Sequence, residues 1–459
     1  EAESPDEYIE GGFHPVSIDD RIGKGGRFKV IHKLGNGGFG TVWLCDDTEH
    51  RKLRAVKIMA ADESGFDAAE LLAMNHLKDV DRQLLDKHHI QVPLEHFWIQ
   101  GPNGQHLCFV QPFLGCQITD LFKYYAFLPE LLKDICFQLA DAMRFLHSKG
   151  LCHADFRPDN ILLRLIPGVE DYTEAGILKY LGEPELVPVI PNPEVEVSEE
   201  DKKRVPKFIV KRASINYGSA LCSTETAVVD FGISFPVEEA PNTTGIPQDY
   251  QAPEATFKLE GKLTPASDIW SLAICFLKIR LGFEPFKSRG LTNQEGLINM
   301  ETIVGPLPRP YREKWRGWEA EFMNCTHDNP DECEICLADE TQHVTIPTEL
   351  LKKNGASRFK EHQTEDFLLY RLRCPQYTLI DEDKYLRIMA QDYKTTGRLP
   401  TCSNDVKDRD NLLMYTMEND EADQLYDLLK KVFKWMPEER ASLDEIINHE
   451  WFGGRYQKQ

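Results

Sequence analysis

Two short motifs contain the side chains that could do chemistry in this chain. Residues 153–160 (His-Ala-Asp-Phe-Arg-Pro-Asp-Asn) include Asp155, Arg157 and Asn160, and the Asp-Phe-Gly of residues 230–232 begins 75 positions after Asp155. A carboxylate such as Asp155 can orient a hydroxyl or accept its proton. The amide oxygen of Asn160 and the carboxylate of Asp230 are the oxygen ligands that magnesium prefers. With the cation of Arg157, this set could serve the transfer of a phosphoryl group.

A glycine-rich segment near the start of the chain could contact phosphates. Gly35, Gly37 and Gly40 follow the pattern Gly-x-Gly-x-x-Gly between strand-like segments at 28–34 and 41–45. A dinucleotide-binding loop would need a helix after the glycines, whereas a strand follows them here. The segment therefore predicts a hairpin lid whose backbone amides approach phosphates closely. Taken alone, the pattern is equally consistent with an ordinary glycine-rich hairpin.

Lys57 lies in a third strand-like segment, residues 54–59. Its ammonium could hold phosphate oxygens if a carboxylate orients it, although a lysine on the solvated face of a strand is the commoner interpretation. Glu70 is the preferred partner because it precedes an apolar helical segment at a suitable spacing. Glu63 and Asp67 are competing candidates.

Composition limits the classes of protein to consider. Hydrophobic residues make up 41% of the 459 residues, enough for a sizeable core, and the formal net charge is −22. This acidic balance either serves solubility or matches a basic partner, and it argues against direct binding of nucleic acid. We expect no membrane span and no signal peptide, because no long apolar run is present. Twelve scattered cysteines indicate a reducing setting, so we expect a cytoplasmic and/or nuclear protein.

The elements that must position these motifs fall into a β-rich part and a helical part. The predicted strands are at 28–34, 41–45 and 54–59, and the predicted helices are at 66–78, 131–146, 268–281, 423–433 and 443–452. Residues 165–225 are rich in Pro, Glu and Val, show little helical signal and indicate an insert or tethered loop. Residues 1–27 indicate an extended lead-in.

Taken in order, the motifs resemble those of the eukaryotic protein kinase family over roughly residues 28–452. The matching residues are Gly35, Gly37, Gly40, Ala55-Val56-Lys57, Glu70, His153, Asp155, Asn160, Asp230-Phe231-Gly232, Ala252-Pro253-Glu254 and Asp268-Ile269-Trp270. The resemblance implies an α+β fold with two lobes, a small β-rich lobe with the hinge at 28–114 and a larger, mainly helical lobe at 115–459. It also implies an ion pair between Glu254 and Arg440.

Within that family, the chain is most similar to the SR-protein kinases of the CMGC group. The similarity lies in Tyr8-x-x-Gly11-Gly12-Phe13-His14-Pro15-Val16, in the spacer-like interruption between Leu163 and Val228, and in a His-x-Asp loop without arginine. Residues 300–308 resemble part of the CMGC insert region, expected at about 286–410. The resemblance implies serine/threonine phosphorylation of a basic, Arg/Ser-rich splicing-factor-type protein by a monomer. A CMGC-related kinase with another substrate preference stays an alternative.

The resemblance also implies ATP and magnesium as cofactors and assigns roles to residues. Asp155, Arg157, Lys57 and Glu70 would be catalytic, and Asn160 and Asp230 would hold magnesium. Gln111 would occupy the gatekeeper position, and adenine would bond the backbone near Phe113 and Leu114. The expected nucleotide contacts are Leu34, Gly35, Asn36, Gly37, Gly38, Gly40, Val42, Ala55, Lys57, Gln111, Phe113, Leu114, Asn160, Leu162 and Asp230.

Three positions depart from the family pattern. Ala154 replaces an arginine that many kinases use to bind an activation-loop phosphate, which predicts activity without that phosphorylation. Arg157 replaces the usual lysine, keeping its charge with a different geometry. Gln251 replaces the arginine usual before Ala-Pro-Glu in CMGC kinases, which weakens the expectation of a particular substrate preference.

Three further hypotheses stand beside these interpretations. Cys325, His327, Cys333 and Cys336 could hold zinc, although ordinary cysteines in an acidic loop are the simpler interpretation. A pseudokinase scaffold would have lost Lys57, Asp155, Asn160 or Asp230, and none is lost. A small-molecule kinase would lack the Ala-Pro-Glu and Asp-Ile-Trp motifs.

Overall fold

The computed structural model describes residues 2–190, 198, 201–213, 220–242, 244–258, 263–287, 294–311, 366–378, 393–399 and 413–453. The chain divides into two compact units. Unit 1 comprises Glu1–Tyr124, Pro158–Ser234 and Leu379–Asn411, and unit 2 comprises Tyr125–Arg157, Phe235–Thr378 and Leu412–Gln459. These units are not the same divisions as the predicted lobes, whose boundaries stay a prediction. Among the described helices, none is long and apolar enough to cross a membrane.

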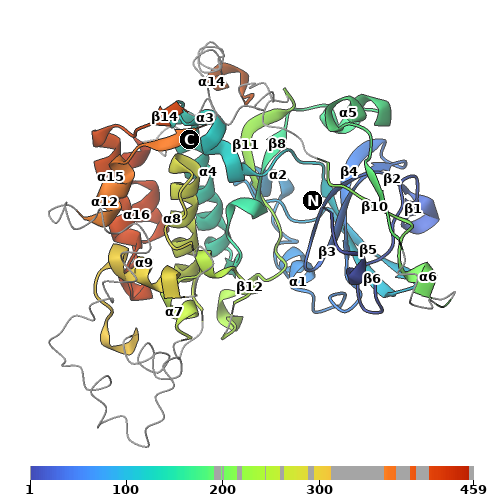
Figure 1. The fold of residues 1–459 in the computed structure, drawn as a ribbon, viewed down its shortest axis with the longest axis horizontal. Coiled ribbons are helices and arrows are strands. Elements are labelled where there is room, and N and C mark those ends of the chain that lie inside the picture. Colours follow the sequence, from blue (N-terminus) through green and yellow to red (C-terminus); the bar gives the residue numbers. More distant parts are fainter. Residues whose placement is uncertain are drawn as a thin grey trace, which may run out of the picture. The chain divides into compact units, whose positions relative to one another are not determined.

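Unit 1 is built on a six-stranded sheet with the order β1-β2-β3-β4-β6-β5, in which every neighbouring pair is antiparallel (Figure 1). The strands are β1 (Arg21–Ile22), β2 (Phe28–Gly37), β3 (Gly40–Asp47), β4 (Lys52–Met59), β5 (Glu95–Gly101) and β6 (Gly104–Pro112). The three strands predicted from the sequence are therefore present. Short helices α1 (Ala69–His76) and α2 (Arg82–Lys87) lie between β4 and β5 in the sequence.

Consecutive apolar residues along these strands point to opposite faces, so the sheet buries both of its faces. One face carries Val30, Trp43, Cys45, Val56, Ile58, Cys108 and Val110. The other face carries Ile31, Leu44 and Leu53. A second pair of strands, β8 (Ile161–Leu165) and β11 (Cys222–Val228), is antiparallel and joins the residue-160 motif to the residue-230 motif.

The predicted insert at 165–225 is more structured than its composition indicated, so the expectation of a loop is wrong for part of it. The structure contains α5 (Glu174–Leu181), β9 (Leu186–Pro188), α6 (Asp201–Arg204) and β10 (Phe208–Val210) within that range. Thr173 caps the start of α5 by accepting a hydrogen bond from the amide of Gly176. Ile177 of α5 packs against the sheet face that carries Leu44 and Leu53. Tertiary packing therefore stabilises elements whose local signal is weak.

The amino-terminal segment is also packed onto unit 1, where the sequence indicated only an extended lead-in. Tyr8 and Phe13 are buried in a cluster with Ala60 and Ile209. Glu3 forms an ion pair with Lys33 of β2, and neither side chain has appreciable exposure to solvent. The hydroxyl of Tyr8 donates a hydrogen bond to Glu3 at 2.5 Å. The segment is thus part of the core of this unit.

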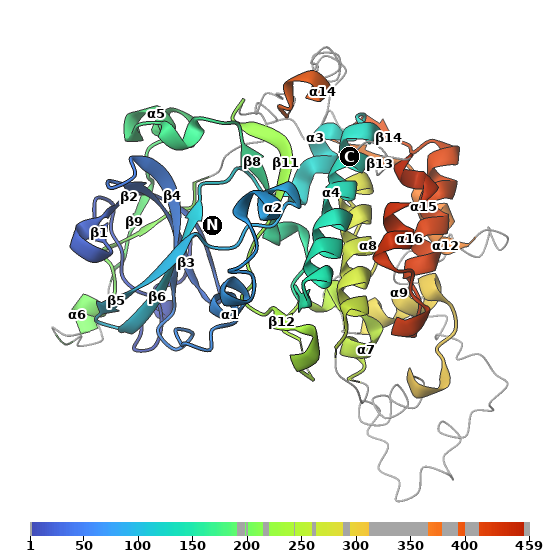
Figure 2. The same ribbon diagram turned by 180° about the vertical axis from the view of Figure 1, so that it is seen from behind.

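Unit 2 is mainly helical. Helices α4 (Pro129–Ser148) and α8 (Pro265–Leu281) lie side by side, and α16 (Leu443–Ile447) also packs on α4 (Figure 2). Unit 2 also contains the helices α7 (Pro253–Thr256), α9 (Gln294–Val304), α12 (Phe367–Arg373) and α15 (Asn419–Val432). Its strands form two antiparallel pairs, β7 (Leu151–Cys152) with β12 (Phe235–Pro236) and β13 (Gln376–Thr378) with β14 (Leu413–Tyr415). Each predicted helix in this part corresponds to an observed one, although the last ends at Ile447 and a 3-10 turn, Glu450–Phe452, follows it.

Candidate active site

The glycine-rich segment forms the hairpin that the sequence predicted. Gly37 pairs with Gly40 at its closed end, and Gly35 pairs with Val42. Gly40 must be glycine, because its φ is +152° and a Cβ would lie 2.2 Å from the carbonyl oxygen of Ile58. No atom lies within 4 Å of a Cβ built at Gly35, Gly37 or Gly38. The backbone of this loop is therefore open to a ligand.

Lys57, on β4, lies between two carboxylates of the same unit. Its Nζ donates to Oε2 of Glu70 at 2.6 Å and to Oδ1 of Asp230 at 2.8 Å. Of the three carboxylates proposed as partners from the sequence, Glu70 is the one that the structure pairs with Lys57. Burial alone would lower the pKa of Lys57, but the charges of Asp230 and Glu70 raise that pKa above its ordinary value. The ammonium is therefore held charged in a buried position.

Gln111, predicted at the gatekeeper position, contacts the partner of that lysine. Its amide Nε2 donates to Oε1 of Glu70 at 3.0 Å, so the two oxygens of Glu70 are shared between Lys57 and Gln111. Ala55 faces Gln111 across the β4–β6 ladder. The amide thus fixes the orientation of Glu70, which the resemblance alone did not indicate.

The pairing of β8 with β11 brings Asn160 and Asp230 to the same end of a ladder. Val228 pairs with Ile161, and the amide of Val229 donates to the carbonyl of Asn160 at 2.9 Å. Asp230 has a φ of +63°, an unusual conformation for a residue other than glycine, and such strain often marks functional positions. An amide and a carboxylate oxygen at adjoining positions suit a hard cation such as magnesium.

The residues predicted around adenine belong to unit 1, and their side chains form apolar packing. Leu114 and Leu162 pack with Ala227 and Val229. Leu34 and Phe113 pack with the sheet face that α5 covers. Because the side chain of Phe113 is buried in this core, its backbone is the part that could face a ligand. The assignment of these contacts stays a prediction, as it does for Asn36 and Val42.

In unit 2, the loop at 153–157 contains the predicted base. Arg157 Nε donates to Oδ1 of Asp155 at 3.0 Å, so the cation and the carboxylate of this loop form an ion pair. Ala154 has a φ of +66°, again a left-handed conformation for a residue with a side chain. Asp268 of α8 supports this backbone, because its Oδ2 and Oδ1 accept from the amides of His153 at 2.8 Å and Ala154 at 2.9 Å.

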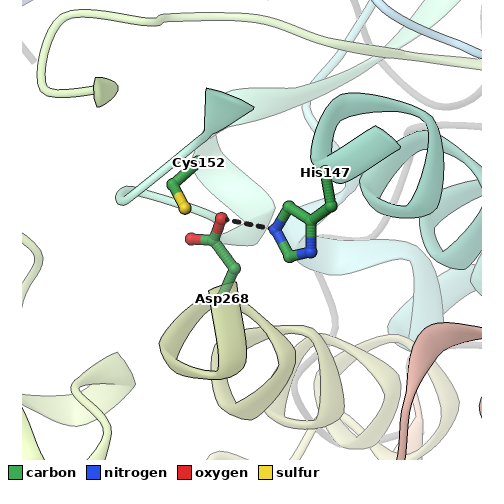
Figure 3. A group of neighbouring side chains, drawn as sticks. All are labelled: His147, Cys152 and Asp268. Atoms are coloured by element: carbon green, nitrogen blue, oxygen red, sulfur yellow. Dashed lines mark hydrogen bonds and ion pairs between the residues drawn. The ribbon is translucent and has the colours of Figure 1, made fainter. Parts of the chain in front are cut away.

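His147, Cys152 and Asp268 gather beside this loop (Figure 3). Their potential ligand atoms lie within 4.8 Å of one another, which raises the question of a metal. Burial raises the pKa of the Cys152 thiol, which disfavours the thiolate that a metal would need. Both oxygens of Asp268 already accept hydrogen bonds, and Nε2 of His147 lies 3.0 Å from Oδ2. We therefore interpret the group as a support for the loop.

The ion pair predicted between Glu254 and Arg440 is confirmed. The guanidinium of Arg440 contacts both oxygens of Glu254, at 2.8 and 2.6 Å, and its side chain is fully buried. Ser267 donates to Oε1 of Glu254 at 2.7 Å. This bidentate pair joins α7 to the loop after α15 and fixes the segment that carries Gln251.

Some supporting residues were not identified from the sequence. His147 was not singled out, although a histidine in the last turn of a long apolar helix is a signal that could have drawn attention to it. Asp268 was recognised as part of a family motif without a role, which the structure now supplies. The predicted zinc ligands Cys325, His327, Cys333 and Cys336 lie outside the described residues.

Comparison with known proteins places these features in context. The sequence profile of the family described as "Protein kinase domain" matches residues 28–169 and 221–452. The unmatched residues between the two segments fall within the predicted insert. A solved structure titled as a kinase domain aligns with a TM-score of 0.55 at 19% sequence identity, covering 95% of this chain and 98% of that one. At this identity, the alignment shows the fold alone, and it confirms the predicted kinase fold.

Several curated proteins are similar in sequence. Serine/threonine-protein kinase spk-1 of Caenorhabditis briggsae is 36% identical over 171 residues, covering 36% of this chain and 15% of that protein. SRSF protein kinase 3 of Homo sapiens is 36% identical over 192 residues, covering 38% and 33%. Dual specificity protein kinase CLK1 of Mus musculus is 29% identical over 343 residues, covering 73% and 60%. The chain thus matches less than two thirds of each relative's length, and the SRSF kinase name agrees with the resemblance to SR-protein kinases.

Proposed function

Because the chain belongs to the protein kinase domain family, we propose that it is an ATP-dependent serine/threonine protein kinase. The observation that carries the proposal is Lys57 held between Glu70 and Asp230 at 2.6 and 2.8 Å. A buried lysine with two carboxylates is oriented and kept charged, as the binding of phosphate oxygens requires.

The residues of unit 1 would bind the nucleotide. Lys57 would hold the α- and β-phosphates, and the glycine hairpin, with open space beside Gly35, Gly37 and Gly38, would lie over the phosphates. Asn160 and Asp230 would hold magnesium, which supplies charge neutralisation on the phosphates when bound. Phe113 and Leu114 would offer backbone groups to adenine.

The residues of unit 2 would act on the hydroxyl that receives the phosphoryl group. Asp155 would accept a hydrogen bond from that hydroxyl and orient its oxygen, and it would take the proton as the oxygen attacks. Arg157, now paired with Asp155 at 3.0 Å, would stabilise negative charge on the transferred group. Asp268 would keep the loop in the left-handed conformation at Ala154 that presents Asp155.

We further propose an Arg/Ser-rich, basic protein as the substrate and a monomer as the active form. The name of SRSF protein kinase 3 among the relatives supports this substrate class, as does the net charge of −22. Ala154 supports activity without phosphorylation of the segment after Asp230, because alanine offers no cation to a phosphate. Treatment with a phosphatase should leave the activity unchanged, and loss of activity would contradict this part.

One assay tests the proposal. The chain is incubated with ATP and magnesium and with an arginine–serine repeat peptide, a Ser-Pro peptide or a generic basic protein. We expect transfer to the repeat peptide first, and Asp155→Ala should abolish transfer while circular dichroism shows an intact fold. Transfer to the Ser-Pro peptide alone would move the substrate to another CMGC class. Binding of ATP with no transfer to any substrate would favour the pseudokinase scaffold.

A further inference from the structure

Two cysteine thiols from distant parts of the sequence meet in unit 1. The Sγ atoms of Cys116 and Cys222 lie 3.8 Å apart, although 106 positions separate the two residues. Cys116 follows the hinge residue Leu114 by two positions. Cys222 begins β11, the strand that leads to Asp230.

Backbone hydrogen bonds fix both cysteines to the same strand, β8. The amide of Gly115 donates to the carbonyl of Leu163 at 2.8 Å, and the amide of Leu163 donates to the carbonyl of Cys116 at 2.9 Å. Cys222 is paired with Leu165 of the same strand. Because both backbones are tied to β8, the two cysteines are held close to each other, and their side chains bring the sulfur atoms to 3.8 Å.

Gly115 shows how close the two segments lie. A Cβ at this position would be 2.7 Å from Sγ of Cys222, closer than real Cβ contacts allow. The thiol of Cys222 therefore lies directly against the backbone that precedes Cys116. A side chain at residue 115 would force Sγ of Cys222 to move.

Exposure distinguishes this pair from other described cysteines of the unit. Cys45 and Cys108 are fully buried, and burial raises the pKa of each thiol, so a soluble oxidant has no access to a reactive thiolate there. Cys222 is equally buried, but Cys116 is partly exposed. Cys116 is therefore the more exposed residue of the pair and the one assigned to meet an oxidant first, and Cys222 is positioned as the resolving thiol beside it.

We propose that Cys116 and Cys222 are a redox modification site that closes to an intramolecular disulfide. The co-reactant is a low-molecular-weight disulfide of the glutathione class. The thiolate of Cys116 attacks it, forming a mixed disulfide and releasing one thiol. The thiolate of Cys222 then attacks Sγ of Cys116, releasing the second thiol. Two protein thiols are oxidised and one small disulfide is reduced to two thiols. The sulfur atoms must approach by about 1.8 Å to reach bonding distance.

The disulfide would couple redox state to the predicted nucleotide site, a consequence that rests on the proposed function. Leu114 packs with Leu162 and Val229 beside that site. Drawing Cys116 toward Cys222 shifts the segment that follows Leu114 and stiffens the start of the strand that leads to Asp230. We therefore expect weaker ATP binding in the oxidised chain.

The test uses the full chain, incubated with glutathione disulfide and digested without reduction. Mass spectrometry should find one peptide pair linked through Cys116 and Cys222, with the loss of two hydrogens, ~2 Da, and dithiothreitol should reverse the link. Cys116→Ser and Cys222→Ser should each prevent the link. Cys374→Ser, which removes a partly exposed thiol of unit 2, should leave it unchanged.

Two outcomes would overturn the proposal. One is a stable glutathione adduct on Cys116 with no internal link. The other is a link from Cys116 to another cysteine, such as Cys374. The ATP-induced rise in melting temperature should shrink on oxidation of the wild type but not of Cys222→Ser. Because mass spectrometry detects the disulfide directly, this test does not depend on whether the chain transfers phosphoryl groups. A link without any change in ATP binding would remove only the coupling.

Discussion

Two buried lysines of the same sheet each form an ion pair with a glutamate, and one of them also contacts a second carboxylate. Lys57 of β4 contacts Glu70 and also Asp230. Lys33 of β2 contacts Glu3 and lies 5.4 Å from the centre of the Trp43 ring, a cation–π distance. Both ammonium groups are removed from water, so each needs its carboxylate to remain charged.

The second carboxylate changes the electrostatics of the pair. With Asp230 added, the pKa of Lys57 lies above its ordinary value in spite of burial. At Lys33, burial lowers the pKa and Glu3 offsets this only in part. A lysine with two carboxylates can exchange one of them for a phosphate and stay paired with the other. A lysine with a single carboxylate would leave that carboxylate buried without a cation if it turned to a phosphate. The comparison therefore separates a lysine suited to a ligand from a lysine that stabilises the fold.

The largest expected effect on activity comes from Lys57→Met. Removing the ammonium takes away an electrostatic contact that the transferred group requires, so kcat/KM should fall on the order of 10²- to 10³-fold. A peptide phosphorylation assay measures this, with the folded state checked by circular dichroism. Lys33→Met is the matched control and should retain most activity per folded molecule. Equal loss of activity in both variants would remove the distinction between the two lysines.

The second prediction concerns stability. Lys33→Met leaves Glu3 buried without its cation, so the free energy of unfolding should fall by about 3–5 kcal/mol. Denaturant unfolding followed by fluorescence measures this change. Adding Glu3→Gln removes the stranded charge and should restore a large part of the loss. If the double variant is as unstable as Lys33→Met, the cost arises from packing and not from charge.

A third, smaller effect is expected at the residue that shares Glu70. Gln111→Leu removes the hydrogen bond to Oε1 of Glu70 while filling similar space. A hydrogen bond to a charged group contributes about 1.5 kcal/mol, so we expect roughly a tenfold weaker kcat/KM. Steady-state kinetics at varied ATP would show it. Unchanged kinetics would mean that Lys57 alone is sufficient to orient Glu70.

The smallest effect near neutral pH is expected in the amino-terminal segment, where stability depends on pH. Burial and the neighbouring His106 lower the pKa of His14 from 6.5 to about 4. The unfolded chain therefore binds more protons between these values, and stability is lost as pH falls from 6.5 toward 4. Melting temperatures of the wild type and His14→Phe across this window test the claim. The difference between the two proteins should depend on pH only in this window, and parallel curves would contradict it.

The motifs of the candidate site could be predicted from the sequence because each one is a short run of residues whose types and order are read directly. Lys57 and Glu70 follow strand and helix patterns that place them correctly, and their pairing was anticipated. Glu3 and Lys33 could not be matched in this way, because no periodicity connects a terminal carboxylate to a strand lysine. Gln111 was singled out from the sequence, but its hydrogen bond to Glu70 depends on a rotamer that the sequence does not encode.

The insert shows the limit of composition as a guide. Its proline-rich, acidic character indicated a loop. The short helix α5 nevertheless forms there, directly after Thr173, a residue type that favours helix starts. Three-residue strands such as β9 have no readable alternation, and Leu186, Val187 and Pro188 are all exposed. Ile177 of α5 and Val210 of β10 pack on apolar surface that only the assembled unit contains, and β9 is held by its pairing with β10.

One practical consequence follows from how the insert touches the sheet. Ile177 packs on one face of the sheet and Val210 on the other. Residues 170–220, which the family profile leaves unmatched, are the stretch that a protein chemist would first delete to obtain a smaller domain for crystallisation or inhibitor screening. Such a deletion would strip apolar cover from both sides of the sheet at once. A minimal version of this protein should therefore keep α5 and β10 and begin its trimming elsewhere.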